Sequence, residues 1–263
     1  MDFQTIKEKV NGIPYTLPEM AKDLYTFIIR EKPCSCLELG FGHGASSCYI
    51  AAALDELGSG HLTSVDLLPA QEWQTPTIEE LLARTGLEDF VTIAREHTSY
   101  TWFLKKEIEA HSQDNVCEPI YDFCFVDGAK NWTIDGATFF LLDKLLKPEG
   151  WIVFDDLQWT YMSKIKEGKR KTDGVFMLEM GPDELNQPHI ELIFKLLVIQ
   201  HPDYSNFRVK DNWWAWAQKV KGDKNVVFEY SADYLKKRSD WEAKTGTKHR
   251  APFEPFETFT GRT

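Results

Sequence analysis

The stretch Leu37-Glu-Leu-Gly-Phe-Gly-His-Gly-Ala-Ser46 decides the fold of this chain of 263 residues. A short apolar run, Cys36–Gly40, meets further glycines at alternate positions, and a segment of helical period, Ala45–Leu57, follows directly. Glycines at such a junction let the backbone bend sharply and approach a ligand closely at the positive end of a helix. The stretch therefore predicts a first strand, a tight turn suited to a ligand, and a first helix.

The same alternation of short apolar runs and helical segments continues after this stretch. It predicts four more strands, His61–Asp66, Phe90–Ala94, Tyr121–Asp127 and Trp151–Asp155, and three more helices, Thr77–Arg84, Thr101–Ala110 and Thr133–Leu146. Further on, Phe207–Val209 and Trp214–Val220 resemble the two strands of a hairpin, with a tight turn at Asp211-Asn212. The pattern indicates an α/β protein with a doubly wound, Rossmann-like, mostly parallel sheet.

The periodicity divides the chain into three parts. Residues 1–33 form a helical lead-in, residues 34–221 a single α/β domain, and residues 222–263 a charged and aromatic appendage with no convincing period. Between the fifth strand and the hairpin lies a polar segment with a basic run, Lys164–Lys171. We interpret this run as a solvated face, or alternatively as a lid loop that favours an anionic substrate.

Composition excludes several classes of protein. The formal net charge is −11 and 43% of residues are hydrophobic, which argues against disorder and against nucleic acid or an anionic membrane as the default partner. No apolar run approaches the roughly 18–20 residues of a membrane helix, and the first ten residues lack the apolar core of a signal peptide. Together with five cysteines, an odd number, this predicts a cytoplasmic protein.

The glycine turn carries two details that point to its ligand. Its spacing is G-x-G-x-G, whereas dinucleotide sites use G-x-G-x-x-G to seat a pyrophosphate. Glu38 precedes the first glycine, Gly40, by two positions, and a carboxylate suits an ammonium group better than a pyrophosphate. Asp66 ends the second strand, where a carboxylate can accept hydrogen bonds from ribose hydroxyls. These residues predict a pocket for a nucleoside with a cationic tail.

Three more carboxylates follow strand ends. Asp127 ends the fourth strand, and Asp155 and Asp156 end the fifth, so all three are expected at the carboxyl edge of the sheet. They would repel one another unless a cation neutralised them. Hard oxygen ligands suit Mg²⁺ first, with Ca²⁺ or Mn²⁺ as alternatives. The alternative for Asp156 is that it only caps the following helix.

The stretch Leu37–Ser46, with Asp66 after the second strand, resembles motif I and its partner acid in class I S-adenosylmethionine-dependent methyltransferases. The resemblance covers roughly residues 34–220 and implies a seven-stranded sheet that ends in an antiparallel hairpin strand. It also implies a site that binds S-adenosyl-L-methionine as the cofactor. The turn would seat the methionine part, Ser46 would bind its carboxylate, and Asp66 would hold the ribose. His97 would lie beside the adenine. The remaining cofactor-binding candidates are Glu38, Gly40, Gly42, His43, Gly44 and Asp127.

Two further segments, Phe125–Lys130 and Leu146–Asp156, resemble the metal-dependent O-methyltransferases of the catechol and caffeoyl-coenzyme A types. The resemblance implies that Asp127, Asp155 and Asp156 hold the metal and that Lys130 acts on the substrate hydroxyl. The pair Asp155-Asp156 also resembles natural-product sugar O-methyltransferases, in which an Asp at the fourth strand is the base. Whether Lys130 or Asp127 is catalytic therefore stays open, as does a role in natural-product biosynthesis.

The expected reaction is methyl transfer to a hydroxyl of a small molecule, which a metal would orient and acidify. The alternatives are an NAD-dependent oxidoreductase on the same sheet, a cofactor-binding protein without activity, and transfer to nitrogen or carbon. A homodimer is left open. Aromatic side chains could form the walls of the substrate pocket, although one of the last two is expected in the core: Trp132, Trp159, Tyr161, Trp213 and Trp214.

Overall fold

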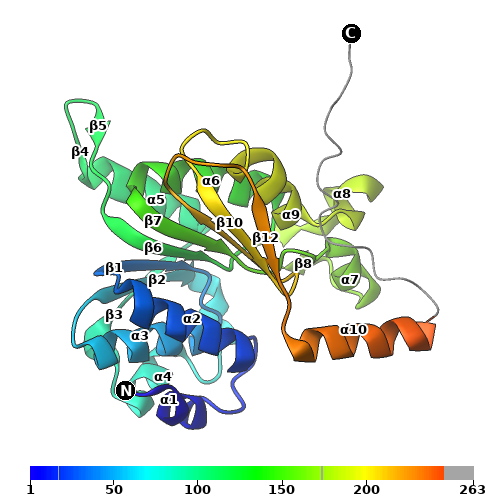
Figure 1. Cartoon of the computed structure of the whole chain (residues 1–263), viewed down its shortest axis with the longest axis horizontal. Helices are drawn as coiled ribbons and strands as arrows, with labels where there is room; N and C mark the ends of the chain where they lie inside the picture. The colour runs from blue at the N-terminus through cyan, green and yellow to red at the C-terminus, as the bar shows by residue number, and fades with distance from the viewer. Residues whose placement is uncertain (17, 173, 246–263) are drawn as a thin grey trace.

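A central sheet lies between two layers of helices in the computed structural model, which describes residues 1–16, 18–172 and 174–245 (Figure 1). The strand order is β12-β10-β11-β7-β6-β1-β2-β3. The strands are β1 (Ser35–Leu39), β2 (His61–Leu67), β3 (Val91–Glu96), β6 (Tyr121–Val126), β7 (Leu146–Phe154), β10 (Ser205–Lys210), β11 (Trp214–Gln218) and β12 (Val226–Glu229).

The five central strands confirm the predicted doubly wound sheet. Strand β1 pairs in parallel with β2 on one side and with β6 on the other, and β3 and β7 extend the two sides in parallel. The chain therefore leaves β1 in one direction for β2 and β3 and returns to the other side for β6 and β7. Ligands bind outside the carboxyl ends of strands at such a switch point, which here lies between β1 and β6.

The far end of the sheet has one strand more than predicted. The hairpin is confirmed, because β11 pairs antiparallel with both β7 and β10. Strand β12 then adds in parallel to the free edge of β10, which gives eight strands instead of seven. The sheet thus continues beyond residue 221, where we predicted the domain to end. Four residues of strand flanked by charged segments are too short to give a clear period.

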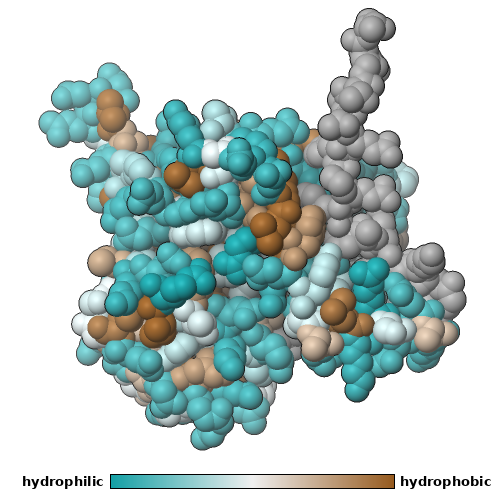
Figure 2. Space-filling model, in the orientation of Figure 1, coloured by the Kyte–Doolittle hydropathy of each residue, from teal (hydrophilic) through white to brown (hydrophobic). Residues whose placement is uncertain are grey.

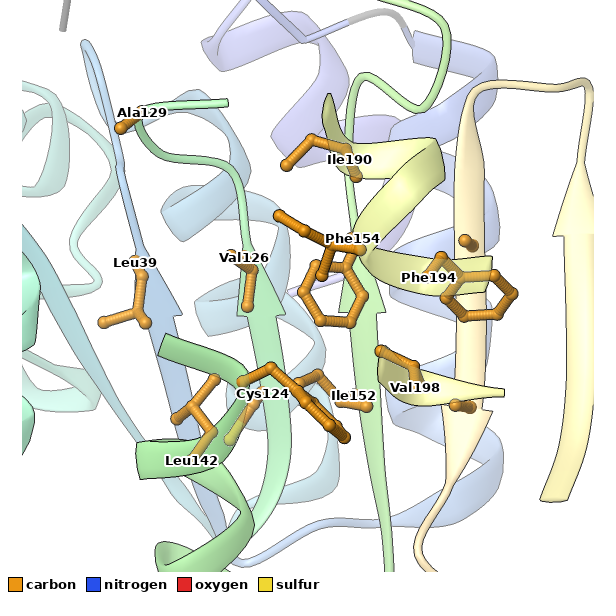
Figure 3. Packing of buried hydrophobic residues seen from close by; sticks show 14 of the residues in the cluster. Leu39, Cys124, Val126, Ala129, Leu142, Ile152, Phe154, Ile190, Phe194 and Val198 are labelled. Atoms are coloured by element: carbon orange, nitrogen blue, oxygen red, sulfur yellow. The ribbon is translucent and has the colours of Figure 1, made fainter. Parts of the chain in front are cut away.

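Helices cover both faces of the sheet. On one side lie α1 (Phe3–Lys9), α2 (Pro18–Glu31), α3 (Ala45–Leu57) and α4 (Ile78–Thr85), whose apolar residues share a buried cluster with Phe123 of β6 and Trp216 of β11. On the other side lie α5 (Tyr100–Ala110), α6 (Trp132–Leu145) and α9 (His189–Ile193), which continues as a π-helical segment, Phe194–Val198. Figure 3 shows Leu39, Val126 and Phe154 of three neighbouring strands on this second face, with Ile190 and Phe194 opposite them.

Several short elements and one longer helix, α10, complete the described part of the chain. They are η1 (Leu68–Glu72), η2 (Glu88–Phe90), the hairpin β4 (Ser112–Gln113) and β5 (Val116–Cys117), α7 (Tyr161–Lys166), the hairpin β8 (Lys171–Thr172) and β9 (Val175–Phe176), η3 (Met177–Glu179), α8 (Pro182–Asn186) and α10 (Ala232–Thr245). In the basic run, Lys164 and Lys169 both pair with Glu167. These pairs are typical of a solvated face; the lid stays a prediction.

The surface view shows a mainly hydrophilic face with small separate groups of hydrophobic residues (Figure 2). Among the described residues, none of the helices combines the length and the apolar character that crossing a membrane requires.

Candidate active site

The site forms where β1 and β6 end side by side. Leu39 and Val126 are register partners, so Gly40 and Asp127 follow them at neighbouring positions of the carboxyl edge. The backbone N–H of Asp127 donates to the carbonyl oxygen of Leu39 at 2.8 Å. Gly40 has a φ of +90°, and a Cβ there would lie 2.2 Å from the carbonyl oxygen of Asp127. Only glycine fits this position, so the glycine turn is in direct contact with the backbone of Asp127, the residue that carries the first carboxylate.

The turn reaches Asp66 through a backbone hydrogen bond. The N–H of Gly42 donates to Oδ2 of Asp66 at 2.9 Å, and the N–H of Leu67 donates to its Oδ1 at 2.6 Å. Gly44, with a φ of +90°, is the N-cap of α3, and a Cβ there would lie 2.6 Å from the side chain of Ile78. The structure therefore brings together the turn, the start of α3 and the end of β2, as the sequence indicated.

Glu38 lies beneath the turn and is fully buried. Its Oε2 accepts hydrogen bonds from the hydroxyls of Ser47 and Ser64, while its Oε1 is buried with no hydrogen-bond partner among the described residues. Burial raises the pKa of the Glu38 carboxyl, and hydrogen bonds from neighbouring serine hydroxyls oppose this rise. A buried acceptor without a donor is the feature that a cationic or hydrogen-bonding ligand would satisfy.

The two predicted histidines have different surroundings. His43 is 7% exposed, its Nδ1 lies 3.1 Å from the carbonyl oxygen of Pro76, and its ring stacks on Tyr15 at 5.7 Å. It is therefore fixed at the rim of the turn. His97 is exposed beyond the end of β3, and its role beside an adenine stays a prediction. Ser46 is 5% exposed in the first turn of α3.

The three carboxylates predicted at strands β6 and β7 converge. One oxygen of each of Asp127, Asp155 and Asp156 lies within 4.8 Å of the other two. Oδ1 of Asp155 accepts from the indole N–H of Trp214 at 2.7 Å and from the backbone N–H of Asp156 at 2.6 Å, which fixes its orientation. Thr160, not Asp156, is the N-cap of α7, so the alternative reading of Asp156 as a helix cap is wrong.

Lys130 enters this cluster from the loop after β6. Its Nζ lies 3.1 Å from Oδ1 of Asp127 and 3.1 Å from Oδ2 of Asp156. Burial raises the pKa of Asp127 to about 7, the nearby Lys130 ammonium opposes this rise, and the charge of Asp156 adds to it. Burial, followed by the charges of Asp127 and Asp156, also raises the pKa of Asp155. Three ionised carboxylates and one ammonium would leave two negative charges, a donor set that suits a divalent cation.

A cleft lies between the start of α3 and the carboxylates. It is lined by Tyr15, Thr16, Met20, Ser46, Phe125, Asp127, Asp155, Trp213 and Trp214. Trp213 is 43% exposed and Trp214 only 2%, so one of the two neighbouring tryptophans is in the core as predicted. The other three aromatic residues proposed for the walls, Trp132, Trp159 and Tyr161, do not line this cleft.

Some residues that shape the site carry no motif in the sequence. Gln74 is 2% exposed, and its side-chain nitrogen lies 3.3 Å from Oδ2 of Asp66. Tyr100 and Asp135 are buried behind the loop that carries Lys130, joined by a hydrogen bond. A buried tyrosine or aspartate within a helical segment is a weak signal, because only the tertiary structure shows what it contacts.

Comparison with known proteins supports the same reading. A family model described as a methyltransferase domain matches residues 37–157. No curated protein matches the chain. The fold is similar to that of an O-methyltransferase from Bacillus cereus in complex with S-adenosylhomocysteine, at 18% identity and a TM-score of 0.54, over 82% of this chain and 87% of that chain.

Two further solved structures are similar in fold. One is an O-methyltransferase from Streptomyces achromogenes involved in tomaymycin synthesis, in complex with S-adenosylmethionine, at 16% identity and a TM-score of 0.52, over 83% and 89% of the two chains. The other is a methyltransferase from Podospora anserina with bound S-adenosylhomocysteine, at 14% identity and a TM-score of 0.55, over 84% and 87%. Residues 37–157 therefore match a methyltransferase domain, within a fold similar to that of these solved structures.

Proposed function

We propose that this protein transfers the methyl group of S-adenosylmethionine to a hydroxyl of a small molecule, with a divalent metal held by Asp127, Asp155 and Asp156. The observation that carries the proposal is the contact between Gly40 and Asp127. It joins the predicted cofactor turn to the carboxylate cluster at one edge of the sheet. Methyl transfer from a sulfonium is an in-line displacement, so it requires the donor and the acceptor oxygen to be held side by side.

The cofactor roles follow from the residues around the turn. Asp66 would accept hydrogen bonds from the ribose, since its carboxylate lies against the turn at Gly42. Glu38 supplies negative charge beneath the turn, where its buried Oε1 has no hydrogen-bond partner in the described chain. Ser46, in the first turn of α3, lines the cleft and would bind the methionine carboxylate at the positive end of that helix.

The acceptor roles follow from the cluster. A bound Mg²⁺ would supply Lewis acidity that lowers the pKa of the acceptor hydroxyl. Asp127 and Lys130 are the two candidates to take up the acceptor proton, and the charge of a bound metal would oppose the burial that raises the pKa of Asp127. Lys130 forms two ion pairs that favour its ammonium form, which would stabilise a developing oxyanion. Lys130→Arg distinguishes a cationic role of Lys130 from a role as a base, because arginine keeps the positive charge and cannot act as a base.

The first test is calorimetric titration with S-adenosylmethionine and, separately, with NAD, each with Mg²⁺ and with EDTA. Micromolar binding of S-adenosylmethionine, about −8 kcal/mol, supports the cofactor. Binding of NAD instead, or of neither, refutes the proposed function. Catechols, phenols and sugar-like hydroxyls then serve as acceptors, with transfer followed by mass spectrometry. The acidic overall charge suits a small molecule rather than a nucleic acid.

The metal is tested separately. Activity that is lost in excess EDTA and restored by Mg²⁺ supports a role for the metal. Full activity in the chelator refutes that role without contradicting the proposed methyl transfer. Asp127→Asn should abolish transfer and leave S-adenosylmethionine binding largely unchanged. Asp122→Asn is the matched control, because Asp122 lies at the other end of the same strand and pairs with Lys147.

A further inference from the structure

The loop between β6 and α6 carries Lys130 in an unusual backbone conformation. Lys130 has a φ of +55°, in the left-handed region that non-glycine residues rarely adopt. In this conformation its Nζ also lies 3.0 Å from the carbonyl oxygen of Gly128, in addition to its two carboxylate partners. An unfavourable backbone conformation persists only where the surrounding structure holds it, so the residues that hold this loop decide where the ammonium lies.

Buried side chains behind the loop bind its backbone. The hydroxyl of Tyr100 accepts from the N–H of Ala129 at 3.0 Å, and the hydroxyl of Tyr161 donates to the carbonyl oxygen of Ala129 at 2.7 Å. Oδ2 of Asp135 accepts from the N–H of Asn131 at 2.6 Å. Hydrogen bonds from buried side chains thus hold the backbone of both sequence neighbours of Lys130, Ala129 and Asn131. Figure 3 shows Ala129 on the loop beyond the end of β6.

Tyr100 occupies the centre of this arrangement. Its hydroxyl both accepts from Ala129 and donates to Oδ1 of Asp135, and both side chains are almost completely buried. Its ring also fills the space beside Gly128, where a Cβ would lie 2.1 Å from Cε1 of Tyr100. One residue of α5 therefore contacts two consecutive positions of the loop, Gly128 and Ala129.

We propose that Tyr100, together with Asp135, is a positioning residue for the transfer reaction, which holds the loop so that the Lys130 ammonium stays between Asp127 and Asp156. The inference rests on the proposed function for its kinetic consequence, whereas its structural consequence is independent of it. Removal of the Tyr100 hydroxyl removes its hydrogen bonds with the N–H of Ala129 and with Oδ1 of Asp135. The loop then relaxes, and Lys130 leaves its two carboxylate partners for part of the time.

The test is Tyr100→Phe, with Tyr204→Phe as the matched control. Tyr204 is also buried, and its hydroxyl donates at 3.1 Å to Asp143, an aspartate on the same helix α6 as Asp135 but near its other end. The control therefore removes a tyrosine–aspartate hydrogen bond from α6 without touching the loop. Tyr161→Phe is a second test variant that loosens Ala129 from the opposite side and serves if Tyr100→Phe does not fold.

The first readout needs no methyl acceptor. Limited acetylation of the lysines with acetic anhydride, followed by mass spectrometry, reports how accessible Lys130 is relative to Lys147. Lys147 pairs with Asp122 at the opposite ends of β6 and β7. We expect labelling of Lys130 to rise at least about threefold in Tyr100→Phe, because local opening exposes it, and to stay unchanged in Tyr204→Phe. Equal labelling in all three proteins overturns the inference, whatever the enzymatic activity.

The second readout is kinetic and uses the acceptor that the screen identifies. We expect kcat to fall about tenfold or more in Tyr100→Phe, since small displacements of reacting groups cost large factors, while the dissociation constant of S-adenosylmethionine stays unchanged. In a Lys130→Ala background, Tyr100→Phe should cause no further loss of kcat, because the group it positions is gone. A full additional loss in that background would show that Tyr100 supports the fold generally and would overturn the inference.

Discussion

Replacing Gly40 with alanine tests the contact that joins the two halves of the site. The new Cβ would lie 2.2 Å from the carbonyl oxygen of Asp127, where ordinary contacts begin near 3.4 Å, so the two loops would have to part by about 1.2 Å. The left-handed conformation itself costs an alanine about 1–2 kcal/mol. Overpacking adds about 1–3 kcal/mol. We therefore expect the free energy of unfolding to fall by about 2–5 kcal/mol.

The movement of the two loops away from each other would also disturb the site. The hydrogen bond from the N–H of Asp127 to Leu39, now 2.8 Å long, would stretch or break as the loops part. We expect S-adenosylmethionine binding to weaken at least about tenfold, which corresponds to about 1.4 kcal/mol, because the turn and Asp127 no longer keep their spacing. Urea unfolding followed by tryptophan fluorescence gives the stability, and calorimetric titration gives the affinity.

Gly86→Ala is the control for this prediction. Gly86 also has a left-handed φ, +75°, but a Cβ there would have no heavy atom within 4 Å. Its substitution therefore measures conformational strain alone, about 1–2 kcal/mol, and should leave cofactor binding unchanged. If Gly40→Ala destabilises the protein no more than Gly86→Ala does, the close approach of Gly40 to Asp127 adds nothing to the destabilisation and the prediction is wrong.

Three further substitutions test single contacts. In Glu38→Gln, the raised pKa of the wild-type carboxyl means that ionisation costs the folded protein stability as pH rises above 4.5. The variant should therefore gain in Tm relative to the wild type at neutral pH, and a gain that does not shrink toward pH 4.5 would contradict this. Gly128→Ala places a Cβ 2.1 Å from Tyr100 and should lower kcat by about tenfold or more, with unchanged kcat as the contrary result. Trp214→Phe removes the indole donor that lies 2.7 Å from Oδ1 of Asp155 and should lower the free energy of unfolding, measured in urea titrations, by about 1.5–3 kcal/mol. A smaller decrease would mean that this hydrogen bond is not made to an ionised carboxylate.

The sequence was sufficient to predict that the candidate site residues converge at one edge of the sheet. The residues that follow β1, β2, β6 and β7 could be placed at one edge because parallel strands end on the same side of a sheet. The sequence thus predicts that Gly40, Asp66, Asp127 and Asp155 share one edge of the sheet, and the structure confirms this placement. The register of β1 and β6 then determines which residues of the two loops meet.

The supports of the site could not be predicted. Tyr100 and Asp135 lie 35 positions apart, and each fits an ordinary helical pattern, so nothing local indicates that they share a hydrogen bond. The left-handed conformation of Lys130 is equally hidden, because lysine has no preference for it. Strand β12 was missed for a related reason, since its pairing with β10 decides its conformation rather than its own short sequence.

Asp127 explains why cofactor and acceptor chemistry should respond to the same substitutions. Its backbone N–H is bonded to Leu39 and its carbonyl oxygen lies against Gly40, while its side chain accepts from Lys130. A single residue thus fixes the distance between the turn that would hold the sulfonium and the cluster that would hold the acceptor oxygen. An in-line displacement tolerates little error in that distance. Substitutions on either side of Asp127 should therefore lower the rate of transfer even where they leave the charge of the cluster intact.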